Sequence, residues 1–274
     1  MSDAIPFISF LTDYGTDDEF VGVCHGVIAT ICPRARVIDV THGIARHDVR
    51  AGAIALAEAL PYLPAGVHLA VVDPGVGARR RAVALGLADG RRLVGPDNGL
   101  LWPAALAGGG VVEVAEITRS PFRLEPVSAT FHGRDIFAPV AARLAAGVAL
   151  AQTGDALEPA ELVTLQLSGG RARIQDGALI AQVRGVDHFG NLQLDAGADD
   201  LAGIGLEVGR TATLQPAGGA TYPLPYVRTF TDVGPGELLL YEDAQRRLAV
   251  AVSHGDAGLR LGSSRGDEIR IRRA

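Results

Sequence analysis

Three side chains in the first half of the chain could together handle one water molecule: Asp73, Arg80 and His132. Asp73 lies in Val71–Gly77, where an apolar run ends at a proline and two glycines, and His132 lies in Thr130–Arg134. An aspartate and a histidine can orient water and accept its proton, and an arginine can stabilise hydroxide-like charge. By residue type alone, a metal hydrolase or an acyl hydrolase could use the same set.

A further carboxylate, Asp13, is expected on a loop that connects a strand to a helix. The short apolar run Phe7–Leu11 precedes it, and the acidic stretch 17–19 follows it. Aspartate at a strand end commonly holds a ribose diol, because one carboxylate accepts two hydroxyl hydrogen bonds. Acidic residues in the first turn of a helix more often complement its dipole, and we favour that role for residues 17–19.

Two other polar segments interrupt the hydrophobic pattern. Pro96–Leu100 is more typical of a turn than of a site. In Val186–Leu192, Asn191 could present a donor and an acceptor to an adenine edge, and Phe189 could offer a stacking face. An ordinary β-turn explains this second segment about equally well.

The remaining histidines give few indications of function. His25, His42, His68 and His254 stand in no pattern that raises them above ordinary core or surface residues. No HxxxH or CxxC spacing supports a metal centre, so we expect no metal ligands.

The elements that must position these residues alternate between strand and helix in the first half, which predicts βαβ units and a mostly parallel sheet. A capping box formed by Thr16 and Glu19 predicts the start of the first helix. The expected strands are 7–11, 37–40, 67–72, 82–87 and 93–94, the last two joined by an Asp89-Gly90 turn. The first expected helix ends near Ile31, and two further helices are expected over 49–60 and 136–150.

After about residue 158 the helical signals fade, and alternating segments predict a small antiparallel β-domain. The segments are 171–174, 178–186, 205–214, 237–241 and 247–252. We therefore expect two domains, 1–160 and 168–274, with the boundary between residues 155 and 168.

Composition narrows the class of protein. The chain has 274 residues, 48% of them hydrophobic, and a net charge of −6 with scattered basic residues, which argues against nucleic-acid binding. No apolar stretch is long enough to span a bilayer, and the N-terminus has no secretory signal. Two cysteines eight residues apart in one expected helix, Cys24 and Cys32, make a disulfide improbable and favour a cytoplasmic location.

Six motifs in register carry a family resemblance. The motifs are Thr12–Gly15, Asp39–His42, Val71–Gly77, Gly95–Leu100, Thr130–Asp135 and Asp187–Asn191. With these motifs the chain resembles the S-adenosyl-L-methionine (SAM) hydroxide adenosyltransferases, the SAM hydrolases related to fluorinase and chlorinase, from about Phe7 to Gly262.

The resemblance implies roles for individual residues. Asp73, Arg80 and His132 match the set that positions the attacking water, and Asp13 matches the aspartate that holds the ribose. In the second domain, Asn191 matches the residue that reads adenine. Further residues implied to bind SAM are Asp18, Glu19, Phe20, Asp187 for the methionine ammonium, Phe189, Phe230, Val252 and His254. Where the family carries an Asn-Ser pair, this chain has Asp243-Ala244, which leaves the binding of the methionine carboxylate open.

The resemblance also implies a fold and a reaction. It implies an α/β N-terminal domain with a central, mostly parallel sheet, a C-terminal antiparallel β-barrel, and a homotrimer with sites between subunits. The implied reaction is hydrolysis of SAM to adenosine and L-methionine by in-line attack on C5′, with no cofactor. A SAM halogenase and a non-catalytic adenosine- or SAM-binding protein are the alternatives. Asp73, His132 and Gly133 favour hydroxide over halide as the nucleophile.

Overall fold

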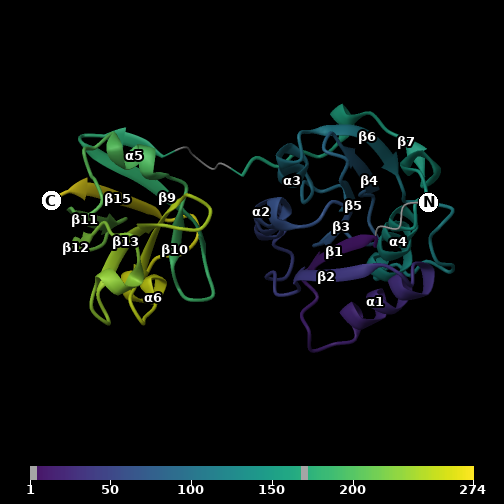
Figure 1. Cartoon of the computed structure of the whole chain (residues 1–274), viewed down its shortest axis with the longest axis horizontal. Coiled ribbons are helices and arrows are strands. Elements are labelled where there is room, and N and C mark those ends of the chain that lie inside the picture. Colours follow the sequence, from purple (N-terminus) through teal and green to yellow (C-terminus); the bar gives the residue numbers. More distant parts are fainter. Residues whose placement is uncertain (1–4, 168–171) are drawn as a thin grey trace. The chain divides into compact units, whose positions relative to one another are not determined.

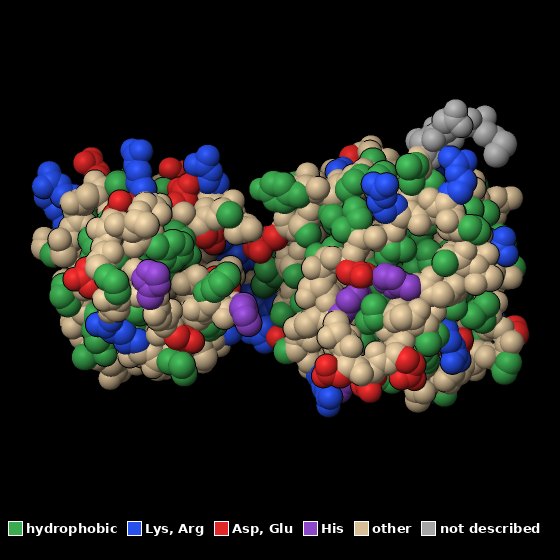
Figure 2. Space-filling model, turned by 60° about the horizontal axis from the view of Figure 1, so that its bottom comes forward, with side chains coloured by type: hydrophobic (Ala, Val, Ile, Leu, Met, Phe, Trp, Pro, Cys, Tyr) green, Lys and Arg blue, Asp and Glu red, His purple; other side chains and the backbone are tan. Residues whose placement is uncertain are grey.

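The computed structural model describes residues 5–167 and 172–274 (Figure 1). The chain divides into two compact units, Met1–Leu167 and Ser168–Ala274, here called the N-unit and the C-unit. None of the described helices is long and apolar enough to cross a membrane. On the face drawn in Figure 2, basic side chains are scattered among acidic and apolar ones.

The N-unit is built on a seven-stranded mixed sheet, as expected from its alternating strand and helix signals. The strand order is β2-β1-β3-β5-β4-β6-β7, in which β2, β1, β3 and β5 run parallel and the remaining neighbours pair antiparallel. The strands are β1 (Phe7–Thr12), β2 (Arg36–Thr41), β3 (Val67–Val71), β4 (Ala82–Leu87), β5 (Arg92–Pro96), β6 (Val111–Glu116) and β7 (Asp155–Ala156).

Helices cover both faces of this sheet, because successive strand residues point to opposite sides. Phe10 packs in a core with helices α1 and α4, whereas Leu11 packs in a second core with α2 and α3. The helices are α1 (Phe20–Ile31), α2 (Val49–Ala59), α3 (Trp102–Ala107) and α4 (Ala138–Ala145), with a π-helical turn η2 (Gly133–Phe137) and the 3₁₀ turns η1 (Leu60–Tyr62), η3 (Leu150–Gln152) and η4 (Pro159–Glu161).

The parallel strands bring the first two predicted carboxylates to one edge of the sheet. β1 and β3 are neighbours, and Thr12 lies opposite Val71 in their register. Asp13 directly follows β1, and Asp73 comes two residues after the end of β3. The carboxyl edge of an open α/β sheet is where ligands bind.

The C-unit is an antiparallel, nearly closed barrel. Its strands run in the order β12-β11-β15-β9-β10-β14-β13, with β8 paired to β9, and a bridge between Tyr226 and Leu240 joins the two ends. The strands are β8 (Arg173–Gln175), β9 (Ala178–Val186), β10 (Leu192–Leu194), β11 (Thr211–Pro216), β12 (Tyr222–Pro225), β13 (Leu238–Glu242), β14 (Leu248–Val252) and β15 (Glu268–Arg273), with helices α5 (Ala198–Ala202), α6 (Ala257–Leu261) and the 3₁₀ turn η5 (Phe230–Asp232).

Two expected helix boundaries in the N-unit are wrong. The first helix begins at Phe20, and Glu19 takes its N-cap position without a side-chain cap. Gly15, at a φ of +73°, turns the chain so that its N–H donates to the His42 carbonyl, which delays the helix beyond Thr16. The helix expected to reach residue 150 ends at Ala145, because Gly147 adopts a φ of +99°.

Two predictions in the C-unit also differ from the structure. The strand expected over 205–214 begins at Thr211, since Gly205 and Gly209 take positive φ values in the preceding turns. Strand β15 was not among the expected segments. Its Ile269 and Ile271 alternate inward as a period of two requires, and β15 pairs with both β11 and β9. Arg171, expected to begin a strand, lies outside the described residues.

Candidate active site

Arg80 joins the three side chains of the predicted water-handling set. Its Nε donates to Asp73 Oδ1 and Oδ2 at 2.9 and 3.0 Å, and its Nη2 also donates to Oδ2. The same Nη2 lies 2.9 Å from His132 Nδ1. The Arg80 and Asp73 side chains are only 10% and 6% exposed, so the ion pair is largely shielded from water.

This geometry assigns the protonation state of His132. A guanidinium has only donors, so Nδ1 of His132 must accept, and the neutral ring carries its proton on Nε2. Burial lowers the pKa of His132, and the positive charge of Arg80 lowers it further, whereas Asp73 opposes the shift. His132 can therefore offer an N–H to a bound water. Asp73, with lone pairs beyond those used by Arg80, is the group placed to accept a proton.

A tight loop returns Arg80 to Asp73. The N–H of Val76 donates to the Asp73 carbonyl at 3.3 Å, and that of Ala78 donates to the Gly75 carbonyl at 3.1 Å. Gly77 has a φ of +75°, and a Cβ there would lie 2.4 Å from the Ala129 carbonyl oxygen. Only glycine fits this approach between the Asp73 loop and the segment that leads to His132.

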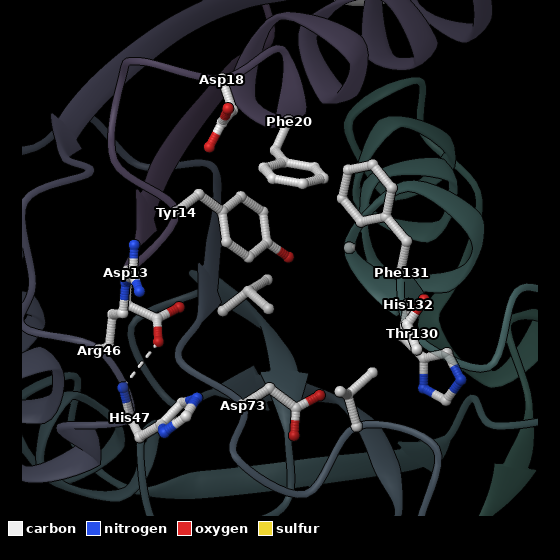
Figure 3. A pocket seen from close by; sticks show the side chains of 13 residues that line it. Asp13, Tyr14, Asp18, Phe20, Arg46, His47, Asp73, Thr130, Phe131 and His132 are labelled. Atoms are coloured by element: carbon white, nitrogen blue, oxygen red, sulfur yellow. Dashed lines mark hydrogen bonds between the residues drawn. The ribbon is translucent and has the colours of Figure 1, made fainter.

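Above this set lies a hollow of about 290 Å³ in the N-unit (Figure 3). Three aromatic rings form one wall, with the Phe20 and Phe131 centroids 5.1 Å apart and Tyr14 within 6.1 Å of both. Burial, with smaller contributions from nearby acidic groups, raises the pKa of Tyr14 well above 10, so its hydroxyl stays protonated. The lining residues are Asp13, Tyr14, Asp18, Phe20, Arg46, His47, Val71, Asp73, Val76 and 130–133.

The hollow contains residues that the sequence did not reveal. Arg46 and His47 line it, and the backbone N–H of His47 donates to Asp13 Oδ2 at 2.9 Å. His47 has a φ of +66°, and a histidine in the sequence gives no indication of this backbone conformation, so only the structure could show this contact. Asp18 and Phe20 also line the hollow. Glu19, predicted to join them, is exposed at the start of α1 and is not among the lining residues.

A second hollow, of about 760 Å³, lies in the C-unit. It brings together most of the C-terminal residues proposed to bind SAM. Phe189 is 75% exposed and Phe230 is 40% exposed, so both rings are available to stack on a flat ligand. The lining residues are Phe189, Asn191, Phe230, Thr231, Val233, Pro235 and 252–255, which include Val252 and His254.

Asp187 lies behind this hollow and shapes its loop. Its Oδ1 accepts the backbone N–H groups of Phe189 and Asn191 at 2.9 and 3.0 Å, and its Oδ2 accepts from Asn191 Nδ2 at 2.8 Å. Asp187 is not among the lining residues, and its role toward an ammonium stays a prediction. Asp187 engages one of the two amide hydrogens of Asn191, so the other hydrogen and the carbonyl oxygen remain for a ligand.

Two further aspartates stabilise turns. Asp243 accepts the N–H groups of Gln245 and Arg247, each at 2.9 Å, and lines neither hollow. Asp97, buried in the Pro96–Leu100 turn, accepts from Arg81 Nε at 2.9 Å and from Val163 N at 2.8 Å. Arg81 is thereby engaged away from Asp73.

Two models of one protein family match most of the chain. Residues 8–154 match the SAM hydroxide adenosyltransferase N-terminal domain, and residues 181–270 match its C-terminal domain. A Salinispora tropica protein named (R)-S-adenosyl-L-methionine hydrolase is 53% identical over 97% of each chain. A Thermus thermophilus protein of the same name is 37% identical over 96% of this chain and 98% of its own length.

More distant relatives and solved structures extend the comparison. A fluorinase from an Actinoplanes species is 31% identical over 90% of each chain. The crystal structure of an uncharacterized conserved protein from Thermotoga maritima is 36% identical, covers 97% of this chain and 100% of that one, and superposes with a TM-score of 0.88.

Proposed function

Since the chain belongs to the SAM hydroxide adenosyltransferase family, we propose that it hydrolyses S-adenosyl-L-methionine to adenosine and L-methionine. The observation that carries the proposal is the contact of one guanidinium with both Asp73 and His132, beside a hollow that Asp13 also lines. A water-holding set thus lies next to a carboxylate suited to a ribose diol. The name of the hydrolase relatives specifies the (R) epimer, and we propose the same epimer as the substrate here.

The chemistry needs a better nucleophile more than a better leaving group. The sulfonium leaves C5′ as a neutral thioether, so no general acid is required. Water is weak, and positioning it in line with the C5′–S bond supplies most of what is missing. Asp73 takes the proton of the attacking water, His132 Nε2–H holds the oxygen, and Arg80 stabilises the developing negative charge. No cofactor takes part.

The aromatic rings of the N-unit hollow are suited to the sulfonium group and to its departure as a thioether. Tyr14, Phe20 and Phe131 exclude bulk water, which strengthens the electrostatic interactions of the reactive groups. Their faces also favour a sulfonium cation over the neutral thioether product, as ring faces attract positive charge. We propose that this difference assists release of methionine.

Product analysis tests the reaction. Purified protein incubated with each sulfonium epimer of SAM, with and without chloride or fluoride, should release adenosine from the (R) epimer, as measured by liquid chromatography and mass spectrometry. A halonucleoside in excess of adenosine would make the chain a halogenase. SAM binding by calorimetry without adenosine release over hours would make it a binding protein.

We also propose a cytoplasmic homotrimer in which the two hollows of one site come from different subunits, as the family resemblance implies. The free, buried Cys24 and Cys32 are in keeping with a reducing compartment. Sedimentation should give the mass of three chains. Co-expressing an Arg80→Ala chain with an Asn191→Ala chain should restore part of the activity that each lacks alone. Without such restoration, each site would belong to a single subunit.

A further inference from the structure

A second group of polar side chains lies outside both hollows, where α1 packs beside β2. His25 extends from α1, Asp39 lies on β2, and His42 directly follows that strand. His25 Nε2 is 2.9 Å from Asp39 Oδ1, and His42 Nε2 is 3.1 Å from the same oxygen. One ligand-type atom from each of the three residues lies within 4.8 Å of the others.

The His42 ring supplies an independent indication of a ligand. His42 is 7% exposed, and its Nε2 makes no hydrogen bond among residues 5–167 and 172–274, although Asp39 Oδ1 lies 3.1 Å away. Buried polar atoms without partners are rare and call for an explanation. The other ring nitrogen, Nδ1, is held by Thr12 Oγ1 at 2.8 Å. A metal-binding histidine is commonly oriented in this way through its second nitrogen.

From this geometry we propose that His25 Nε2, Asp39 Oδ1 and His42 Nε2 bind one divalent transition metal ion of the zinc class. Tetrahedral zinc with bonds of roughly 2.0–2.2 Å places its ligand atoms about 3.3–3.6 Å apart. The separations of 2.9 and 3.1 Å would therefore widen by about 0.2–0.7 Å to admit the ion. Two imidazoles select against magnesium and calcium, which prefer all-oxygen sites. Three protein ligands leave the fourth position to water.

The proposed ion would brace the loop that carries Asp13. The His42 carbonyl accepts the N–H of Gly15 at 2.8 Å, and Thr12 Oγ1 accepts the N–H of Tyr14 at 3.1 Å while it holds the His42 ring. A metal on His42 would therefore fix helix, strand and loop together. Its function is structural, because none of its three ligands lines the hollow.

Metal content of the untagged full-length protein tests the site. After treatment with a chelator, the protein is loaded with zinc, dialysed and measured by elemental analysis. We expect one zinc per chain and a higher thermal unfolding midpoint than in the metal-free protein. Cobalt in place of zinc should give the intense visible absorption of a tetrahedral centre.

Single-residue variants test which side chains bind the metal. His25→Gln and Asp39→Asn each replace a partly exposed metal ligand. Each should weaken zinc binding by more than the roughly 10- to 100-fold that is typical of losing a residue that hydrogen-bonds to a ligand. The matched control His188→Gln removes an exposed histidine of the C-unit and should leave zinc binding unchanged. Absence of retained zinc in the wild-type protein would refute the site. If both ligand variants retained as much zinc as the wild-type protein, the assignment of His25 and Asp39 as ligands would be refuted.

Discussion

Replacing Arg80 with lysine keeps the positive charge and removes the fork that joins Asp73 to His132. A lysine ammonium reaches only to the position of the arginine Cζ. It can still pair with Asp73, but it ends one bond short of the Nη2 that lies 2.9 Å from His132 Nδ1. Arg80→Lys therefore removes one charge-assisted hydrogen bond and leaves the His132 ring free to rotate.

The size of the effect follows from that bond. A hydrogen bond to a charged group contributes about 1.5–3 kcal/mol. Because each 1.36 kcal/mol of barrier is a factor of ten, kcat should fall about 10- to 150-fold. The affinity for adenosine should change little, since Arg80 is not among the residues that line either hollow.

Adenosine release under steady-state conditions gives kcat and KM, and calorimetry gives adenosine affinity separately. Arg79→Lys is the matched control, because Arg79 is an exposed neighbour in the same loop and should behave as wild type. A kcat for Arg80→Lys within about threefold of wild type would refute the reasoning, as that difference is smaller than one such hydrogen bond. A rise in KM alone would reassign Arg80 to substrate binding.

Three further predictions address packing, pH and binding. In Gly133→Ala, the new Cβ would lie 2.1 Å from Tyr14 Oη, so denaturant unfolding should show a loss of about 1–3 kcal/mol, and adding Tyr14→Phe should restore part of it. Burial lowers the pKa of His68 to about 4, so the unfolded chain takes up a proton first as pH falls below 6.5. Stability should drop by roughly 3 kcal/mol between pH 6.5 and 4, and His68→Gln, measured by unfolding at both pH values, should flatten this decline. Asp13→Asn should raise the KM for SAM about 10- to 100-fold in initial-rate assays and change kcat less, and an unchanged KM would exclude Asp13 from ribose binding.

The position of Asp73 could be predicted because an apolar run ending in proline and glycine is a strong local signal. Parallel pairing of β1 with β3 then explains why Asp13 emerges at the same edge. Residues 79–81 are three adjacent arginines, and in the sequence only the family resemblance distinguishes Arg80 from the other two. The structure supplies the physical distinction. Arg79 is exposed and Arg81 pairs with Asp97.

Other features depend on contacts that no local pattern encodes. The backbone of His47 reaches Asp13 only because His47 adopts a positive φ. The protonated nitrogen of His132 follows from its contact with Arg80, 52 residues away in the chain. Likewise, His25 and Asp39 meet because a helix packs beside an edge strand, and their separation of 14 residues matches no metal motif.

The most direct test of the reaction uses water labelled with oxygen-18. If Asp73, Arg80 and His132 direct water at C5′, SAM hydrolysed in labelled water must give adenosine that carries the label in its 5′-hydroxyl, and methionine without label. Mass spectrometry of both products after a single turnover distinguishes the outcomes. Unlabelled adenosine, or label in the amino-acid product, would contradict attack at C5′.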